Sequence, residues 1–531
     1  MKPKNRKPFR VVVADPLHST GWALLKAAPD VIVEGPFDCS ADLQTVLLDA
    51  DALLICSDTK VDTDLLDAAP LLKVIARAGS RLDNVDIDEA ARRGIFVIHV
   101  PEANLVAVVE YTFLLMLMLA RRLSPHSNRR PCGDGVFGFE LAHKTLGIIG
   151  FGHQGREVAA RAQAFGMHVL AYDPYVDLSF AREHRVEIVG LSELLASGDI
   201  ISLHTDYTPQ THHIIDADAF SKMKPGVYLI NSLHADLVDR VALMAALENG
   251  ALGGVALDRW ETGALEDESP FTNQTKVLIL DNQGQATLEA QSNTAKAVVS
   301  DMLAALRRED YRNVVNLPFT QAHSYQAVKP YMDLAVKLGK LQGQLTDGWI
   351  TRVEVELLGE GLQDLVRPVA AILLSGMIRR VDERPVNWIS APVLAYEQGI
   401  ATSQAKELVL QGVYPAMIAC RVSWEGGQRT VAGALFGNGE VRLVTYDDFA
   451  VDAHPDGYVL ILENDDVPGV IGKVGTRLSQ EKINIAQWRY GRDFIGGRGV
   501  SFINLDNRVP DAILEELERE VEIHHAQLVR L

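Results

Sequence analysis

A glycine-rich loop between an apolar strand and a helical stretch constrains the fold of this chain more than any other feature. The segment LGIIGFGHQGREVAARAQAFG places Gly150, Gly152 and Gly155 in the spacing G-x-G-x-x-G. The first glycine allows a tight turn, the second lets the backbone approach a pyrophosphate, and the third lets the helix pack closely on the strand. The helix N-terminus then directs its partial positive charge at the phosphates. The segment therefore predicts a dinucleotide-binding β-α-β unit.

An aspartate at the end of the next predicted strand indicates which dinucleotide binds. Asp173 stands in VLAYDPY, 18 residues after Gly155. Its carboxylate can accept hydrogen bonds from the adenosine ribose hydroxyls and would repel a 2′-phosphate. We therefore predict that NAD, and not NADP, is the cofactor. His153 and Gln154 lie between the glycines and complete the predicted cofactor loop.

Short β-branched runs alternate with helical stretches through the first part of the chain. Between residues 10 and 100 the runs are VVVADP, VIVEGP, ALLICS, KVIARAG and FVIHVP, and a second series continues from KTLGIIGFG to VLIL. This alternation predicts an α/β fold with two doubly wound, Rossmann-like lobes. The apolar stretch at 105–120 is predicted to be a helix that joins them. It is shorter than the roughly 20 residues of a membrane span and contains Glu110, so no membrane association is expected.

The pattern changes after Asn316. An amphipathic helix, PYMDLAVKLGKLQGQLTDG, precedes strands such as RVEVELLG and VRLVTYDDF, which indicates an α+β region. From Asp456 onward a strand, a turn, a helix and a strand follow, and the chain closes with SFINLDN and a last helix, DAILEELEREV. The expected divisions of the chain are 1–104 completed by 286–316, then 105–285, 317–455 and 456–531.

The charge and the cysteine content argue against several classes of function. The formal net charge of −19 and a pI near 5.3 disfavour a nucleic-acid partner, whose phosphates require a basic surface. The four cysteines form no C-x-x-C pair, which favours neither a disulfide framework nor a zinc site. The pairs His212-His213 and His524-His525 are given no metal role, because neighbouring side chains on a helix or strand diverge. The start, MKPKNRKPFRVVVADP, lacks the features of a signal peptide, so a cytoplasmic protein without metal is expected.

Segments along nearly the whole chain match one enzyme family. They include IARAGSRLDNVDIDEAARRGIFVIHVP, HKTLGIIGFGHQGREVA, MKPGVYLINS, ALDRWE, NWISAPVLAYEQGI and NDDVPGVIGKVGTRLSQEKINIA. These segments resemble the long-form D-3-phosphoglycerate dehydrogenases within the D-isomer-specific 2-hydroxyacid dehydrogenases. The resemblance implies a substrate-binding first lobe, an NAD-binding second lobe, an intervening regulatory domain and a C-terminal ACT domain (βαββαβ). It also implies a small-molecule acid as substrate, an amino-acid effector at the ACT domain, and a homodimer or homotetramer.

The resemblance also implies positions for cofactor and catalysis. Apart from the glycine loop and Asp173, it places the cofactor near His204, Thr205, Ser232 and Asp258, the last beside the nicotinamide carboxamide. The family removes the hydroxyl proton with a histidine tuned by a glutamate, while an arginine holds the carboxylate or carbonyl of the substrate.

The catalytic residues of the family are replaced in this chain. The arginine position falls on His234 in LINSLHADLVD, and the histidine position falls on Asn282 in VLILDNQGQATLEA. No histidine lies between residues 277 and 290. Asparagine cannot exchange a proton at neutral pH, so the expected acid/base group is absent. The glutamate position falls near Gly263, and either Glu261 or Glu266 could reach inward instead.

The substrate lobe also departs from the family. Cys56 stands where the family commonly has an arginine that helps hold the phosphate of phosphoglycerate. Arg81, next to Ser80, occupies a glycine position in the loop that approaches the substrate carboxylate, whereas Arg77 is retained. The loss of one guanidinium and the gain of another would change which anion binds. Each change also has a plainer interpretation: His234 as a solvated turn residue, Arg81 as a surface charge, and the amide at 282 as a loop cap.

Three functions are consistent with these departures. The first is an NAD-dependent oxidoreductase for a different 2-hydroxy or 2-keto acid, with His234 as acid/base and Arg77 and Arg81 holding the anion. The second is a catalytically inactive NAD-binding protein that acts through its regulatory domains. The third is an ordinary 3-phosphoglycerate dehydrogenase of serine biosynthesis with a rearranged site. We favour the first, and we predict that the protein oxidises 3-phosphoglycerate poorly or not at all.

Overall fold

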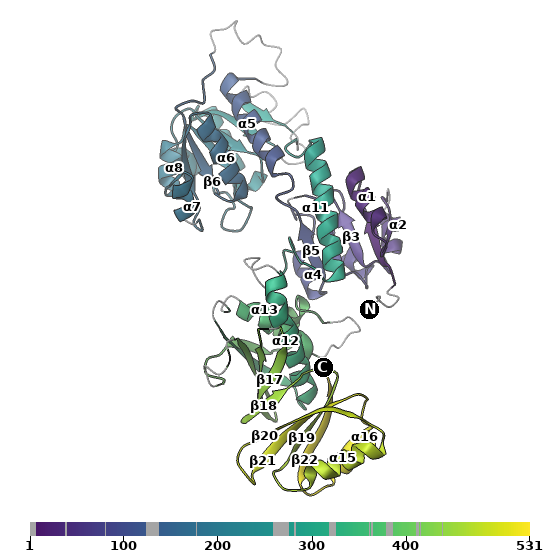
Figure 1. Ribbon diagram of the computed structural model, residues 1–531. Helices are drawn as coiled ribbons and strands as arrows, with labels where there is room; N and C mark the ends of the chain where they lie inside the picture. The colour runs from purple at the N-terminus through teal and green to yellow at the C-terminus, as the bar shows by residue number, and fades with distance from the viewer. Residues whose placement is uncertain are drawn as a thin grey trace.

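The computed structural model contains four sheets, which follow one another along the chain as four lobes (Figure 1). The residues that it describes are 7–37, 40–79, 81–123, 137–176, 178–258, 276–280, 283–317, 325–359, 362, 365–378, 386–409, 414, 416–437 and 439–531. None of the helices in this described part of the chain is both long and apolar enough to cross a membrane.

The first lobe is a five-stranded parallel sheet of order β2-β1-β3-β4-β5. Its strands are β1 (Phe9–Val13), β2 (Val31–Glu34), β3 (Ala52–Ile55), β4 (Val74–Arg77) and β5 (Phe96–His99). Its helices are α1 (Ser19–Ala27), α2 (Ser40–Leu47), α3 (Thr63–Asp67), α4 (Ile87–Arg92) and α11 (Leu288–Arg307). Helix α11 returns from later in the chain to pack against α1 (Figure 1). Strands β3 and β4 are buried along their whole length, as helices on both faces of a parallel sheet require.

The second lobe is a seven-stranded parallel sheet of order β12-β11-β10-β9-β6-β7-β8. Its strands are β6 (Thr145–Ile149), β7 (His168–Tyr172), β8 (Glu187–Ile188), β9 (Ile200–Leu203), β10 (Val227–Asn231), β11 (Leu252–Leu257) and β12 (Val277–Ile279). Its helices are α5 (Leu105–Arg121), α6 (His153–Ala164), α7 (Leu178–Glu183), α8 (Leu191–Ser197), α9 (Ala217–Lys222) and α10 (Arg240–Glu248). The strand order reverses between β6 and β9, and ligands of such sheets bind at the carboxyl ends beside this reversal. The prediction of two parallel-sheet lobes is confirmed.

The third lobe is a mostly antiparallel sheet of order β14-β13-β15-β16-β17-β18. Its elements are α12 (Tyr325–Leu345), β13 (Ile350–Leu358), α13 (Val366–Met377), α14 (Ser390–Glu397), β14 (Ala401–Gln404), β15 (Met417–Trp424), β16 (Gly427–Leu435), β17 (Val441–Tyr446) and β18 (Phe449–Ala453). Helices α12 and α13 cross so closely that a Cβ on Gly339 would lie 2.3 Å from the carbonyl oxygen of Leu373. Glycine is required at this crossing.

The fourth lobe is a sheet of order β20-β21-β19-β22 with two helices. Its elements are β19 (Tyr458–Asp465), α15 (Val470–Gln480), β20 (Ile485–Arg492), β21 (Arg498–Leu505), α16 (Asp511–Glu518) and β22 (Ile523–Arg530). Residues such as Leu460 and Ile503 pack under the helices. Residues on the opposite face, such as Ile461 and Phe502, belong to the same hydrophobic core as the third lobe. The third and fourth lobes therefore share one core.

The third lobe is fastened to the first by a polar contact and an aromatic cluster. The Asn387 side-chain amide donates a hydrogen bond of 2.6 Å to the carbonyl oxygen of Gly94. The rings of Phe96 and Tyr311 have centroids 4.9 Å apart, and Trp388 lies 4.8 Å from Tyr311. The substrate lobe expected from the sequence is thus in direct contact with the third lobe.

Candidate active site

The glycine loop lies at the carboxyl end of β6 and leads directly into α6. Gly150 has a φ of 96°, and a Cβ there would lie 2.5 Å from the carbonyl oxygen of His204. A Cβ on Gly155 would lie 2.2 Å from the carbonyl oxygen of Gly150, whereas nothing lies within 4 Å of a Cβ on Gly152. No side chain caps the N-terminus of α6. The loop therefore leaves the helix amides and the space at Gly152 open to a pyrophosphate.

Asp173 flanks this loop from the end of β7. One carboxylate oxygen accepts a hydrogen bond from the backbone amide of Phe151, and the other accepts one from that of Tyr175, each of 2.9 Å. A carboxylate oxygen can accept more than one hydrogen bond, so both remain available to a ribose diol. The backbone bonds fix the carboxylate beside the loop, where the sequence analysis expects the adenosine ribose.

His153 and Gln154 lie in the first turn of α6, and His153 reaches toward the first lobe. The His153 Nδ1 atom lies 2.5 Å from a carboxylate oxygen of Glu102, in the segment between the two lobes. Gln154 has a buried amide nitrogen without a hydrogen-bond partner. The cofactor loop therefore contacts the connection between the lobes.

His204 and Thr205 lie under the loop, at the carboxyl end of β9. The His204 ring is buried, and its Nε2 atom lies 2.8 Å from the hydroxyl of Ser202. Burial lowers the pKa of His204 to about 3, so its imidazole is neutral at physiological pH. The backbone of both residues lies against Gly150, since a Cβ on that glycine would also come within 2.7 Å of the Thr205 nitrogen.

Ser232 and Asp258 lie at the carboxyl ends of the next two strands, β10 and β11. Both are buried. Asp258 accepts a hydrogen bond of 3.0 Å from the backbone amide of Gln283, and the Ser232 hydroxyl has no partner. Because β9, β10 and β11 lie on the side of the sheet away from β7, these residues belong to the half that would hold the nicotinamide.

His234 lies in the turn that follows β10. Its Nδ1 atom accepts a hydrogen bond of 3.3 Å from the backbone amide of Asp236 and caps the short helix η1 (Ala235–Leu237). The ring stacks on Tyr207, with centroids 4.4 Å apart and planes inclined by 16°. The side chain is 30% exposed. His234 is therefore held in a defined position, in contrast to the interpretation as a solvated turn residue.

One expectation about neighbouring histidines is wrong in detail. His212 and His213 stack on each other with ring centroids 3.8 Å apart, because His213 has a left-handed backbone with φ 51°. The pair lies in a loop, where the alternation of a strand does not apply. No group of at least three His, Cys, Asp or Glu side chains placed to hold a metal ion occurs in the described part of the chain.

Arg77 is an almost completely buried charged side chain in the first lobe. It ends β4, is only 4% exposed, and its Nε atom has no hydrogen-bond partner. Burial lowers the pKa of its guanidinium, opposed by the charge of Asp83. A Cβ on Gly79 would lie 2.0 Å from the Nη1 atom of Arg77 and 3.7 Å from the Oε1 atom of Gln285. The guanidinium and an amide from the segment before α11 thus converge on Gly79.

The other substrate-lobe residues carry less available charge than the sequence suggests. Arg81 pairs with Asp83 at 3.7 Å. The backbone amide of Cys56 is bound by a carboxylate oxygen of Asp15 at 2.5 Å, and its thiol donates to the carbonyl oxygen of Pro16. Burial raises the pKa of Cys56 to about 12, so the thiol is neutral at physiological pH.

Several predicted residues lie outside the described part of the chain. These are Ser80, Glu261, Gly263, Glu266 and Asn282. The structure adds Tyr207, Asp236, Gln285 and Glu102, which sequence reasoning missed. Only Asp236 carried a signal, since it stands two residues after His234. The others reach the site from separate elements.

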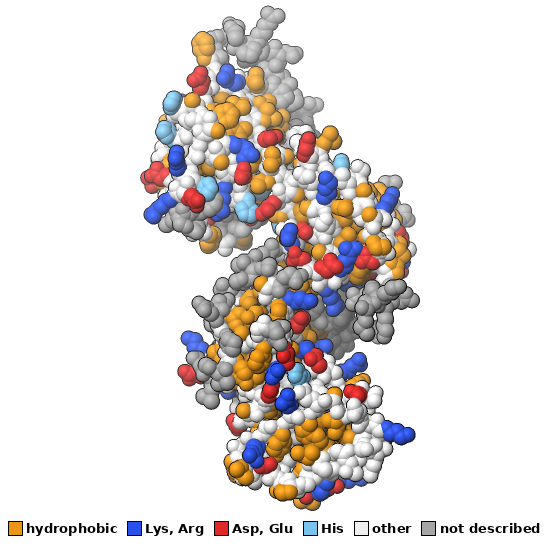
Figure 2. Space-filling model, in the orientation of Figure 1, with side chains coloured by type: hydrophobic (Ala, Val, Ile, Leu, Met, Phe, Trp, Pro, Cys, Tyr) orange, Lys and Arg blue, Asp and Glu red, His pale blue; other side chains and the backbone are white. Residues whose placement is uncertain are grey.

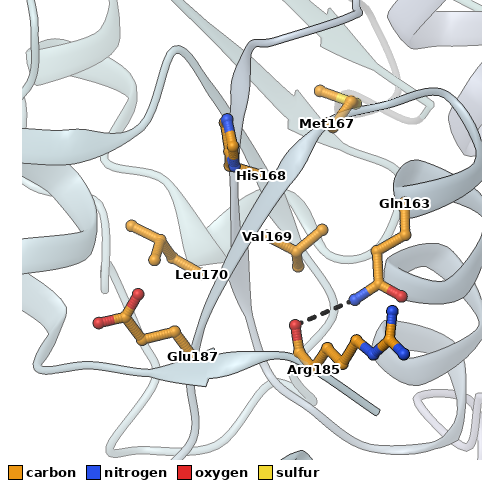
Figure 3. A pocket seen from close by; sticks show the side chains of 7 residues that line it. All are labelled: Gln163, Met167, His168, Val169, Leu170, Arg185 and Glu187. Carbon is orange, nitrogen blue, oxygen red and sulfur yellow. Dashed lines mark hydrogen bonds between the residues drawn. The ribbon is translucent and has the colours of Figure 1, made fainter.

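The second lobe also has a shallow hollow (Figure 3). It has a volume of about 350 Å³ and is lined by residues that include His168 and Glu187, the first residues of β7 and β8. At the rim of the hollow, the side-chain amide of Gln163 donates a hydrogen bond to the carbonyl oxygen of Arg185. The hollow lies at the amino end of the sheet, opposite the end that carries the glycine loop.

Comparisons with known proteins agree with this geometry. The family "D-isomer specific 2-hydroxyacid dehydrogenase, NAD binding domain" matches residues 113–281, and "D-3-phosphoglycerate dehydrogenase intervening domain" matches residues 327–447. D-3-phosphoglycerate dehydrogenase of Synechocystis is 32% identical, over 98% of this chain and 95% of that protein. The enzyme of the same name from Methanocaldococcus jannaschii is 33% identical, over 98% of this chain and 100% of that protein.

Solved structures match a little over half of the chain. The TT0316 protein from Thermus thermophilus is 31% identical with a TM-score of 0.52, and the match covers 58% of this chain and 100% of that one. A glyoxylate reductase from a Paecilomyces species is 27% identical with a TM-score of 0.51, and covers 57% of this chain and 97% of that one.

Proposed function

Because the chain belongs to the D-isomer-specific 2-hydroxyacid dehydrogenase family, we propose that it transfers a hydride between NAD and a small acid other than 3-phosphoglycerate. The substrate class is a 2-hydroxy or 2-keto acid with a single negative charge. The glycine loop and Asp173 support NAD as the cofactor, and the family that matches residues 113–281 is itself an NAD-binding domain.

The observation that carries this proposal is the charge pattern around Arg77. Its guanidinium is buried and lacks a partner at Nε, so an anion that reaches it gains an interaction no protein group now makes. The second guanidinium, on Arg81, is already balanced by Asp83. The thiol of Cys56 is neutral and stands where the family commonly has a phosphate-binding arginine. One available positive charge suits one carboxylate, and it leaves a phosphate dianion under-compensated.

The residues on the nicotinamide side supply the remaining contacts. When bound, NAD provides the hydride acceptor or donor. The Nδ1 atom of His234 accepts a backbone hydrogen bond, so in the neutral ring the proton is on Nε2. His234 can therefore donate to the C2 oxygen of the acid, which is the role of the family arginine at this position. Gln285 offers a neutral amide for a polar group on the rest of the substrate.

A panel of acids tests this function on the full-length protein. The absorbance of reduced nicotinamide is followed with 2-keto acids and NADH, and with 2-hydroxy acids and NAD. We expect turnover of at least one acid of single negative charge, and loss of it in His234→Ala. Turnover of 3-phosphoglycerate above about 1 per second, within the usual enzyme range, would show instead that this is an ordinary phosphoglycerate dehydrogenase.

A second candidate is an NAD-binding regulatory protein without dehydrogenase activity. The replacement of the family histidine by Asn282 favours it, because an asparagine cannot exchange a proton. If this second function is correct, we expect calorimetry to show NAD binding and no acid of the panel to be turned over in either direction.

We also propose that residues 317–455 are a regulatory domain and that residues 456–531 are an ACT-type domain for a small amino acid, in a cytoplasmic homodimer or homotetramer. Support comes from the strand and helix order of the fourth lobe and from the core that it shares with the third. Serine and other amino acids are screened by thermal shift on the full chain and on residues 1–316. A shift that persists in the truncated chain contradicts an effector site in residues 317–531.

A further inference from the structure

Two loops of the second lobe meet beside His234, at the nicotinamide half of the sheet. One loop follows β9 and contains Tyr207, and the other follows β10 and contains His234 and Asp236. The backbone amide of His213 donates to the carbonyl oxygen of Asp236 at 2.8 Å, and that of Ile215 donates to Leu237 at 3.1 Å. These bonds fasten the loops to each other, so the position of Asp236 is fixed by the fold. Histidine side chains are visible on the surface of this lobe in Figure 2.

The carboxylate of Asp236 lies beside the inner nitrogen of His234. The Asp236 Oδ2 atom is 3.7 Å from His234 Nδ1, while the backbone amide of the same residue already bonds to that nitrogen at 3.3 Å. Among the described residues, the titratable groups around this ring are Asp236, Tyr207 and, beyond it, His212, whose Nδ1 lies 3.4 Å from the Tyr207 hydroxyl. Asp236 is the carboxylate that contacts the ring.

The two partners of Nδ1 suit two protonation states of His234. A neutral ring with its proton on Nε2 accepts the Asp236 amide, as observed. A protonated ring cannot accept there, and its Nδ1 proton needs an acceptor. A small rotation of the Asp236 side chain from 3.7 Å would supply one. Stacking on Tyr207 keeps the ring plane fixed in both states.

Resting on the proposed function, we propose that Asp236 is the positioning residue of His234 and that this pair replaces the glutamate and histidine of the family. In the reduction of a 2-keto acid, bound NADH would supply the hydride for C2, and protonated His234 would give its Nε2 proton to the C2 oxygen. The products are the 2-hydroxy acid, NAD and neutral His234, whose remaining proton, on Nδ1, is held by the Asp236 carboxylate. In the reverse direction Nε2 takes the hydroxyl proton in the neutral tautomer that holds its proton on Nδ1 against the Asp236 carboxylate; the tautomer with its proton on Nε2 must first convert to it.

Steady-state kinetics on full-length variants test the catalytic part. Asp236→Asn keeps the size and the backbone amide but removes the carboxylate, and we expect kcat to fall 10- to 100-fold with KM within threefold. Asp236→Glu should recover part of the loss. The matched control is Asp239→Asn, which changes the same charge three residues later, where the side chain caps α10 and lies near His213. Its kcat should stay within twofold, because asparagine also caps helices well.

A spectroscopic measurement tests the contact without any turnover. In nitrogen-labelled full-length protein, the His234 ring signals are identified by their loss in His234→Gln. We expect that the Nδ1 proton of protonated His234 exchanges slowly with solvent in the wild type and in Asp239→Asn, and rapidly in Asp236→Asn. Equal exchange rates in all three overturn the inference. Slow exchange in the wild type without turnover of any acid overturns the proposed function instead and leaves the contact standing.

Discussion

The glycine loop and the turn after β10 lie at the carboxyl ends of one sheet, yet they differ in how the chain recognises a ligand. The loop recognises its ligand through backbone amides, a helix N-terminus and glycines. Backbone atoms occupy the space that a Cβ would need at Gly150 and Gly155, whereas that space is empty at Gly152. The turn and the end of β4 work through side chains, namely His234 and Arg77. Backbone recognition is kept by retaining glycine, whereas side-chain recognition changes with every substitution. The cofactor site therefore matches its family, whereas a changed acid site remains our proposal.

The largest expected effect comes from removal of the Arg77 guanidinium, which is buried and lacks a hydrogen-bond partner at Nε. Arg77→Met should lower kcat/KM for any accepted acid at least 100-fold, because a lost charged contact is worth about 3 kcal/mol. Arg81→Met should cost less than fivefold, since Asp83 already balances that charge. Thermal unfolding should show no loss of stability in Arg77→Met, because the variant removes a buried charge that is only partly hydrogen-bonded. Equal losses in both variants would contradict the assignment of the anion site.

The glycines of the loop provide the matching test on the cofactor side. Gly155→Ala should destabilise the second lobe by about 1–3 kcal/mol, because its Cβ would meet the carbonyl oxygen of Gly150 at 2.2 Å. Gly152→Ala meets no atom within 4 Å, so it should fold normally and weaken NAD binding roughly tenfold. Thermal unfolding and calorimetry separate the two effects. Unchanged NAD affinity in Gly152→Ala would show that the pyrophosphate does not approach there.

The buried His204 should make the cofactor side sensitive to acid. Its pKa is about 3 in the folded protein, below the ordinary value of 6.5, so the unfolded chain binds the additional proton. The contribution of neutral His204 to the free energy of unfolding is fully present above pH 6.5 and is lost as the pH falls from 6.5 toward 3. At pH 5 the loss is about 2 kcal/mol. Urea unfolding of the wild type and of His204→Asn at pH 7 and pH 5 measures it, and an equally steep pH dependence in both proteins would rule it out.

The smallest effect is expected for Asp173→Ala, on the affinities for NAD and NADP. The wild type should bind NAD far better than NADP, because Asp173 accepts from the ribose diol and repels a phosphate. Asp173→Ala should weaken NAD binding roughly tenfold and narrow the preference, since it removes a charged hydrogen-bond acceptor. Titration calorimetry with both dinucleotides decides this. A wild type that prefers NADP would contradict the role of Asp173.

Family, cofactor and the parallel-sheet lobes could be predicted from the sequence because they depend on local patterns. The spacing of Gly150, Gly152 and Gly155 is written in consecutive residues, as is the alternation of strands and helices. The positions of His234 and Cys56 were found in the same way, by their place in matched segments. The partners of these residues were not found, since no local pattern tells which distant side chain lies opposite.

The sequence alone determined that this chain folds into two doubly wound lobes and binds NAD, and it placed a histidine at residue 234. Only the tertiary structure decided that Tyr207 stacks on His234, that Gln285 converges with Arg77 on Gly79, and that Arg81 is balanced by Asp83. It also decided that the third and fourth lobes share one core. Main-chain geometry is set by residues a few positions apart, whereas the charge and contacts of a pocket depend on elements that only packing brings together.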